Sequence, residues 1–247
     1  METCRLLLFD LDGTLLRSDK RITERTLQAL GRCREKGMMI GVSTSRGEEN
    51  AVTFIEELRP DILIASGGAL IKHRGEYIYR AEFSPERTRQ MIGAARSICG
   101  MDCEITIDTV DSHYWNYRTD PKEQDRSWGD SSFTEFRDFG QSALKMCVEI
   151  FDDSQAGRLA ELLDDCDCIR FSDGYWYKFT RKGVTKEAAI RKACAACGIG
   201  LEEVTAFGDD YADIGMLRLC GRGIAMGNAL DVVKEAADLV IGSNDED

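Results

Sequence analysis

The sequence predicts an α/β protein in which a doubly wound, mostly parallel sheet carries an inserted α+β domain. In the first and last parts of the chain, short and solidly apolar runs alternate with helical patterns, as expected for strands buried on both faces. Between these parts, apolar residues alternate with polar ones, which is typical of strands with one solvated face. We therefore expect an α/β core domain at 1–82 and 182–247 and an α+β domain at 83–181.

Length and charge limit the classes of function. The chain has 247 residues, of which 43% are apolar, enough for a sizeable core. Its 44 acidic residues against 32 Lys and Arg give a formal charge of -12. This charge repels nucleic acid and anionic membranes, so neither is expected as a partner. It also repels phosphorylated substrates, so a site for one requires local cations.

The cysteines and the apolar runs predict a cytoplasmic protein. Ten cysteines are scattered along the chain without a disulfide-rich pattern, and neither a signal peptide nor an apolar run of membrane-spanning length is seen. Cys194 and Cys197 have the spacing of a redox or zinc pair. We interpret them instead as part of an apolar helix face with Ile190 and Ala193, because no second ligand pair completes a metal site.

The first strand, Leu6–Phe9, ends in two carboxylates. Asp10 and Asp12 lie on the same side of an extended chain, and Gly13 allows a tight turn directly after them. Ligands of open α/β sheets bind beyond the carboxyl ends of the strands. Two anions this close favour a hard cation such as Mg2+ between them. The alternative is a strand end with solvated acids.

A hydroxyl group follows the second strand. A helix capped by Thr23 and ended at Gly37 leads to a strand at Met38–Val42, in the order of a right-handed parallel crossover. Thr44 comes just after this strand and just before the next helix, where it is placed to bind a phosphate oxygen. An ordinary helix cap explains Thr44 equally well.

The chain then continues through a third core strand into the inserted domain. We expect a helix ended by Pro60, a buried strand at Asp61–Ala65, a close backbone approach at Ser66–Gly68 and a hairpin over 70–80. The inserted domain should contain helices near 85–100 and 156–163 and strands near 103–107, 144–150, 168–171 and 175–179. The irregular stretch 111–139, rich in aromatic residues, is either a substrate-facing loop or a packed part of this domain.

The last third carries a lysine and a second group of acids. Lys186 lies in the first turn of a helix, where a cation is unfavourable unless an anion compensates it. A strand at Val204–Phe207 ends near Asp209 and Asp213, which could share a cation with Asp10 or simply cap the next helix. A helix near 229–237 and a strand at 239–241 should complete the core.

Four separated motifs in this order resemble those of the haloacid dehalogenase superfamily, and most closely its Cof-type branch, which has a class IIB cap. The four motifs are Asp10-Leu11-Asp12-Gly13-Thr14-Leu15, Ser43-Thr44-Ser45-Arg46, Gly183-Val184-Thr185-Lys186-Glu187, and Gly208-Asp209 with Asp213. The segment Gly223–Ala229 matches a fifth signature of the branch. The resemblance implies a Rossmann-like core with an inserted cap, and hydrolysis of a phosphomonoester through an aspartyl-phosphate.

The resemblance also implies a role for each motif residue. Asp10 is the expected nucleophile and Asp12 the general acid and base, while Asp10, Asp12 through its carbonyl oxygen, Asp209 and Asp213 hold Mg2+. The expected phosphate ligands are Thr44, Arg46, Lys186 and Asn228. The expected partner is a small phosphorylated metabolite, bound by a monomer or homodimer.

Three residues depart from the Cof-type pattern, namely Gly67, Glu187 and Ala212. Two functions other than a phosphatase stay open, and these departures bear on the second of them. One is a phosphosugar mutase or phosphotransferase, which returns the phosphoryl group to a hydroxyl. The other is a catalytically weakened protein that binds phosphate and regulates a partner.

Overall fold

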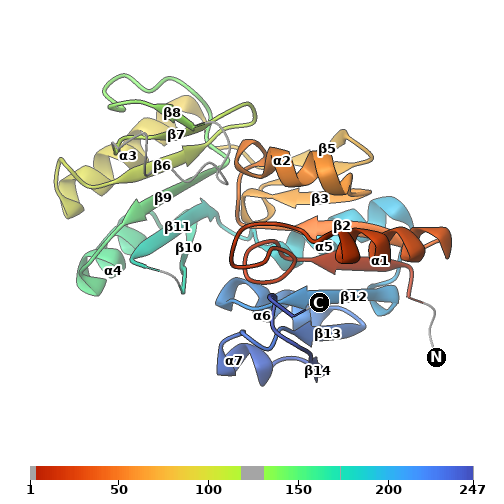
Figure 1. Ribbon diagram of the computed structural model, residues 1–247. Helices are drawn as coiled ribbons and strands as arrows, with labels where there is room; N and C mark the ends of the chain where they lie inside the picture. The colour runs from red at the N-terminus through yellow and green to blue at the C-terminus, as the bar shows by residue number, and fades with distance from the viewer. Residues whose placement is uncertain (1–3, 118–130, 173, 247) are drawn as a thin grey trace. The chain divides into compact units, whose positions relative to one another are not determined.

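The computed structural model describes residues 4–117, 131–172 and 174–246. By their contacts these residues form two compact units (Figure 1). The first unit comprises Met1–Ser45, Phe54–Tyr79 and Thr185–Asp247, and the second comprises Arg46–Thr53 and Arg80–Val184. Residues 46–53 were expected with the core, but their contacts group them with the second unit. The expected domain boundaries stay a prediction.

The first unit is built on an eight-stranded sheet with the order β14-β13-β12-β1-β2-β3-β4-β5. Every pair from β14 to β3 is parallel, and β4 runs antiparallel to β3. The strands are β1 Leu6–Phe9, β2 Met39–Ser43, β3 Ile62–Ala65, β4 Leu70–His73, β5 Glu76–Arg80, β12 Val204–Gly208, β13 Arg222–Ala225 and β14 Leu239–Val240. The predicted mostly parallel core is therefore confirmed.

Helices cover both faces of this sheet, and Figure 1 shows α1 and α5 on opposite sides of β1 and β2. The helices are α1 Glu24–Glu35, α2 Glu48–Leu58, α5 Lys186–Cys197, α6 Ile214–Leu219 and α7 Asp231–Lys234, with 3-10 turns η1 Ser66–Gly68, η3 Leu201–Glu203 and η4 Tyr211–Asp213. Helix α7 is shorter than the expected 229–237. Leu230 just before it donates its backbone N–H to the Asp209 carbonyl, which holds this stretch extended.

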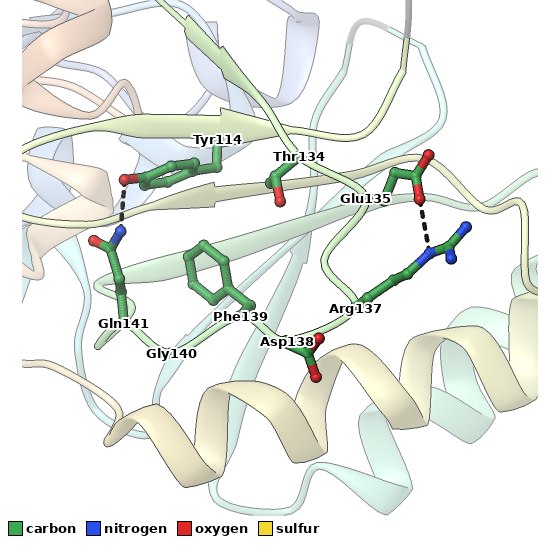
Figure 2. A pocket seen from close by; sticks show the side chains of 8 residues that line it. All are labelled: Tyr114, Thr134, Glu135, Arg137, Asp138, Phe139, Gly140 and Gln141. Carbon is green, nitrogen blue, oxygen red and sulfur yellow. Dashed lines mark hydrogen bonds and ion pairs between the residues drawn. The ribbon is translucent and has the colours of Figure 1, made fainter.

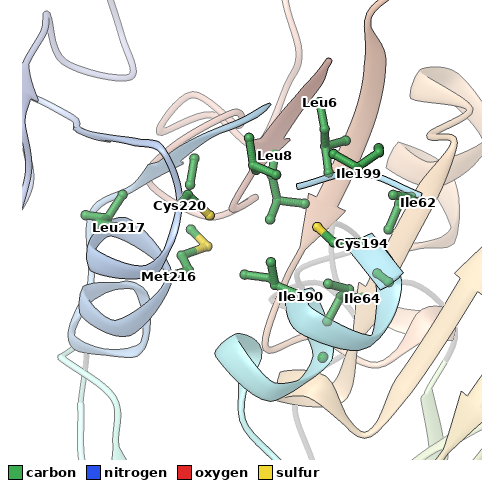
Figure 3. Close-up of a cluster of buried hydrophobic side chains, with 14 of the residues drawn as sticks. Leu6, Leu8, Ile62, Ile64, Ile190, Cys194, Ile199, Met216, Leu217 and Cys220 are labelled. Carbon is green, nitrogen blue, oxygen red and sulfur yellow. The ribbon is translucent and has the colours of Figure 1, made fainter. Parts of the chain in front are cut away.

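One buried cluster joins β1 and β3 to α5 and α6. Leu6 and Leu8 point from β1 toward Ile190 of α5 and Met216 of α6 (Figure 3). Cys194 lies inside the same cluster, and burial raises the pKa of its thiol to about 11. Its packing among apolar side chains agrees with the interpretation of Cys194 as a core residue.

The second unit is a six-stranded sheet with the order β10-β11-β9-β6-β7-β8 and two helices. Its pairs are antiparallel except β7 with β8. The elements are α3 Pro85–Cys99, β6 Ile105–Asp108, β7 His113–Trp115, β8 Ser131–Phe133, β9 Lys145–Glu149, α4 Asp153–Leu162, β10 Cys166–Arg170 and β11 Trp176–Arg181.

The two faces of this second sheet differ in character. Ile107, Met146 and Phe179 lie in one apolar cluster with Met91 of α3 and Leu159 of α4. The residues between them in sequence project from the opposite face, because side chains alternate along a strand. Those residues are polar and include Asp108, Lys145 and Lys178. The alternation of apolar and polar residues predicted for these strands therefore gives the sheet one apolar face and one face that carries charged residues.

Candidate active site

The parallel pairing of β1 with its neighbours brings two acidic strand ends together. Phe9 is opposite Phe207 in β12, and their rings stack with centroids 4.5 Å apart. Asp10 then continues the pairing, since its N–H donates to the Phe207 carbonyl at 3.0 Å. Asp10 and Asp209 therefore emerge at the same edge of the sheet, as one of the two interpretations from the sequence required.

Three carboxylates form a cluster at this edge. Asp10, Asp209 and Asp213 each offer one oxygen, and these oxygens all lie within 4.8 Å of one another. Asp213 is held firmly, because its Oδ2 accepts from the backbone N–H groups of Asp209 at 3.0 Å and Asp210 at 3.1 Å. Clustered carboxylate oxygens of this kind are the donors that Mg2+ prefers.

Lys186 lies between two of these acids. Its Nζ donates to Oδ1 of Asp10 at 2.6 Å and to Oδ1 of Asp213 at 2.7 Å, and the residue is only 3% exposed. Burial lowers the pKa of Lys186, but the two carboxylates raise it more, and the net pKa is above its ordinary value. The anions that compensate a lysine in the first turn of α5 are therefore these two side chains.

Two of these acids, Asp10 and Asp209, have raised pKa values. Burial raises the pKa of Asp10 well above its usual range, and the nearby Asp213 and Asp209 add to this, while Lys186 opposes it. Burial raises the pKa of Asp209 to about 7, although a hydrogen bond from Thr14 lowers it. Both shifts describe carboxylates that lack enough positive charge nearby, which is the condition that a bound cation relieves.

Two glycines let the backbone come close to these acids. A Cβ atom at Gly13, where φ is +74°, would lie 2.2 Å from Oδ2 of Asp209. A Cβ atom at Gly208 would lie 2.5 Å from the Cβ of Asp213. Thr14 next to Gly13 donates its hydroxyl to Oδ1 of Asp209 at 2.7 Å. Thr14 was not singled out from the sequence, and its place inside the first motif is the only signal for it.

Thr44 and Lys186 are connected through a short turn. The Thr44 carbonyl accepts from the N–H of Gly67 at 3.0 Å, and Thr44 itself is buried. Gly68 follows with φ +107°, and a Cβ there would lie 2.3 Å from the carbonyl oxygen of Thr185. The close backbone approach that the glycines predicted is therefore made to the N-cap of α5.

Asp12 and Asn228 are placed beside the acid cluster rather than in it. Oδ1 of Asp12 forms an ion pair with Lys20 at 2.8 Å, and both side chains are about one third exposed, 32% each. The Asn228 amide donates to the Gly13 carbonyl at 2.8 Å and accepts from the N–H of Asn244 at 2.9 Å. Asn228 thus supports the Gly13 turn, and its contact with phosphate stays a prediction.

Arg46 groups with the second unit. It is buried, and its guanidinium donates to the backbone carbonyl of Asn50 at 3.0 Å. Its role at the phosphate stays a prediction. Glu187, which departs from the Cof-type pattern, lies against α6, since a Cβ at Gly215 would overlap its carboxylate.

A hollow of about 410 Å3 in the second unit contains none of the predicted site residues (Figure 2). It is lined by Tyr114, Thr134, Glu135, Arg137, Asp138, Phe139, Gly140 and Gln141. Tyr114 accepts from Gln141 at 2.6 Å and packs edge-on against Phe139 at 5.2 Å. In the stretch 111–139, Tyr114 is therefore a partly buried residue that packs against the apolar cluster of its domain, while 118–130 lie outside the described residues.

Comparisons with known proteins identify the family of the chain. A family model described as haloacid dehalogenase-like hydrolase matches residues 7–247. The chain is 24% identical to the 5-amino-6-(5-phospho-D-ribitylamino)uracil phosphatase YitU of Bacillus subtilis, with 98% of this chain and 93% of that protein covered. It is 27% identical to the pyridoxal phosphate phosphatase YbhA of Escherichia coli, with 99% and 96% covered.

A solved structure has the same fold as this chain. The HAD subclass IIB sugar phosphatase BT4131 superimposes with a TM-score of 0.85 at 25% identity, covering 98% of this chain and 95% of that one. Across residues 4–117, 131–172 and 174–246, no helix is long and apolar enough to cross a lipid bilayer. The chain therefore belongs to the haloacid dehalogenase-like hydrolases, and its resemblance to their Cof-type, class IIB branch is confirmed.

Proposed function

We propose that this protein is a Mg2+-dependent phosphatase that hydrolyses the phosphomonoester of a small metabolite through an aspartyl-phosphate. The observation that carries the proposal is the meeting of Asp10, Asp209 and Asp213 around Lys186 at the carboxyl end of the sheet. The relatives named as phosphatases of small phosphorylated metabolites support the choice of substrate class.

The residues present fit a magnesium ion. Three carboxylate oxygens lie close together, and two of the acids have raised pKa values. Asp10, Asp209 and Asp213 would hold the ion, with the Asp12 carbonyl as the further ligand that the family resemblance implies. When bound, Mg2+ offsets the repulsion between the nucleophile and the anionic phosphate.

In this proposal Asp10 acts as the nucleophile. Its Oδ1 accepts from Lys186, so Oδ2 is the oxygen assigned to attack phosphorus in line. Lys186 and Thr44 would hold the oxygens of the transferring group. Asp12 would protonate the leaving oxygen and then take a proton from the attacking water. Its partial exposure and its ion pair with Lys20 are compatible with proton exchange.

The test is phosphate release from a panel of sugar phosphates, pyridoxal phosphate and ribityl phosphates, with MgCl2 or with EDTA. We expect Mg2+-dependent release by the wild type and none by Asp10→Asn, whose circular dichroism should match the wild type. Near-normal turnover by Asp10→Asn would refute the nucleophile, and full activity after exhaustive chelation would refute the metal.

The same panel separates the two alternative functions. A mutase or phosphotransferase would convert the phosphate esters into one another or into new esters without equivalent release of free phosphate. A weakened regulatory protein would bind the esters and turn none of them over.

A further inference from the structure

We propose that the segment 243–246 (the clamp) holds the loop 13–18 (the Gly13 loop) in place and thereby positions the acids of the proposed metal site. Asn244 and Asp245 are the positioning residues in this inference, and neither is assigned to the ion or to the substrate. The inference rests on the proposed function, because the Gly13 loop directly follows Asp12 in the first motif. All the residues that carry it lie in the first unit.

The Gly13 loop is joined to two acids of the site. Thr14 donates its hydroxyl to Oδ1 of Asp209 at 2.7 Å. The N–H of Leu15 donates to the backbone carbonyl of Asp10 at 3.3 Å. A displacement of this loop therefore reaches two of the three carboxylates that would hold the ion.

The clamp binds the Gly13 loop directly at two points. Nδ2 of Asn244 donates to the backbone carbonyl of Leu16 at 2.9 Å. The Asp245 carboxylate accepts from the N–H of Ser18 at 2.9 Å and from the hydroxyl of Ser18 at 2.7 Å. Nε of Arg17 also lies 3.6 Å from Oδ1 of Asp245. The second half of the loop is thus tied to two consecutive side chains of the clamp.

A third connection runs through Asn228. Its Oδ1 accepts from the backbone N–H of Asn244 at 2.9 Å, and its Nδ2 donates to the carbonyl of Gly13 at 2.8 Å. This amide therefore bridges the clamp and the first residue of the loop. Together the three connections fix the loop backbone at Gly13, Leu16 and Ser18.

The clamp is held in shape by its own hydrogen bonds and by the turn after β13. Oε2 of Glu246 accepts from the N–H of Ser243 at 2.9 Å, and the N–H of Glu246 donates to the carbonyl of Ser243 at 3.0 Å. The N–H of Gly227 donates to the carbonyl of Gly242 at 2.9 Å, and a Cβ at Gly227 would lie 2.9 Å from the nitrogen of Ser243. The clamp is therefore preorganised, and its bonds to the loop do not have to order it as well.

Side-chain packing does not replace these bonds on the side of the clamp. A hollow of about 210 Å3 lies there, and its lining includes Thr14, Leu15 and Arg17 of the loop with Ser243 and Asn244 of the clamp. Side chains that border a hollow lack contacts on that side. The hydrogen bonds from the clamp are therefore the contacts that hold this side of the loop.

The position of these bonds separates their effect on the site from their effect on stability. Asp245 is exposed and Asn244 is half-buried, so water replaces much of what their bonds contribute to folding. A side chain that orients a metal ligand without touching the ion changes metal affinity by about 10–100-fold. Loss of the clamp contacts should therefore weaken Mg2+ binding more than it weakens the fold.

The test is calorimetry of Mg2+ binding to the double variant that carries Asn244→Ala and Asp245→Ala. Asp245→Asn is the conservative variant, because an amide can accept from the N–H of Ser18 and donate to its hydroxyl oxygen. Asp238→Ala is the matched control, since Asp238 is also exposed and its Oδ2 accepts from the N–H of Gly223 at 2.8 Å, at the beginning of β13. Asp245→Ala alone serves if the double variant does not fold.

We expect the double variant to raise the Kd for Mg2+ by about tenfold or more and to lower kcat. Its midpoint in urea should shift no further than that of Asp238→Ala, which should bind Mg2+ like the wild type. Asp245→Asn should also keep the Kd of the wild type. An unchanged Kd in the double variant, or an equal rise in Asp238→Ala, overturns the inference.

Hydrogen exchange keeps this test separate from the proposed function. The N–H groups of Leu15 and Leu16 donate to the carbonyls of Asp10 and Leu11, so their exchange reports on the loop without metal or substrate. Faster exchange of both in the double variant, but not in Asp238→Ala, supports the clamp even if the protein hydrolyses no ester, in which case the proposed function alone fails. Unchanged exchange in the double variant contradicts the inference.

Discussion

Replacing Gly13 with alanine should move Asp209 and disable the site, and the structure provides a control for the backbone effect alone. Gly13 and Gly37 both have positive φ angles, +74° and +84°. A Cβ atom at Gly13 would lie 2.2 Å from Oδ2 of Asp209, whereas a Cβ at Gly37 would have nothing within 4 Å. The two variants therefore share the conformational strain and differ in the collision with the acid.

The expected magnitudes follow from the backbone strain, which both variants share, and from the collision with Asp209, which only Gly13→Ala has. A left-handed conformation costs a residue with a Cβ about 1–2 kcal/mol, so both variants should lose about this much unfolding free energy. In Gly13→Ala the Asp209 carboxylate must also move by roughly 1 Å to reach ordinary contact, and a displacement of this size at a reacting centre costs about 100-fold in rate. Gly37→Ala should keep its kcat/KM and its affinity for Mg2+.

The assays are urea unfolding for stability, calorimetry for Mg2+ binding and phosphate release for kcat/KM. Gly13→Ala should be separated from Gly37→Ala by its loss of Mg2+ affinity and of turnover, not by stability alone. If the two variants have the same kcat/KM and bind Mg2+ equally, the close approach of Gly13 to Asp209 has no functional role and the proposed metal site is wrong.

Three further outcomes follow from the charges of the site. Lys186→Met removes the cation shared by Asp10 and Asp213, so it should lower the unfolding free energy by about 3–5 kcal/mol near neutral pH. The loss should be smaller at acidic pH, because the raised pKa of Asp10 lets that carboxyl take up a proton and need no cation; an equal loss at both pH values in urea unfolding would contradict this. Because burial raises the pKa of Asp209 to about 7, its contribution to the stability of the metal-free protein is present at low pH and is lost as the pH rises through that value. Added MgCl2 should therefore raise Tm more at about pH 8 than at about pH 5, and the opposite order would count against the site. Thr14→Val removes the hydrogen bond that lowers the pKa of Asp209, so Mg2+ binding followed by calorimetry should shift to higher pH, and an unshifted profile would show that the bond is unimportant.

The sequence allowed the acid cluster to be predicted because its geometry follows from topology. Parallel strands have their carboxyl ends along one edge of the sheet, so the acids after Val204–Phe207 could be expected on the same edge as Asp10. The pairing of β1 with β12 in the structure brings them next to each other. The misplacement of Lys186 at a helix start signalled an anion, and two were found. These predictions needed only strand order and the direction of the helix dipole.

Other contacts could not be predicted, because they depend on register and on side-chain direction between distant segments. No periodicity indicates that Asp108 faces Lys145, or that Gly47 lies against both Asp108 and Asn50. The hydrogen bond from the Asn228 amide to the Gly13 carbonyl could not be predicted either. The motif around Asn228 predicted that it lies at the edge of the pocket, but not which group its amide contacts. The shortened α7 likewise follows from a single backbone bond to Asp209.

The charge count at the acid cluster gives a reason for a divalent rather than a monovalent ion. When ionised, Asp10, Asp209 and Asp213 contribute three negative charges, and Lys186 contributes one positive charge, so two negative charges remain uncompensated. Burial is the main cause of the raised pKa values of Asp10 and Asp209, and the neighbouring carboxylates add to it. A divalent cation balances the two uncompensated charges completely, and both acids then stay ionised at neutral pH. Asp10 thereby becomes available as a nucleophile, so in this proposal the same ion that attracts the phosphate also keeps the attacking oxygen unprotonated.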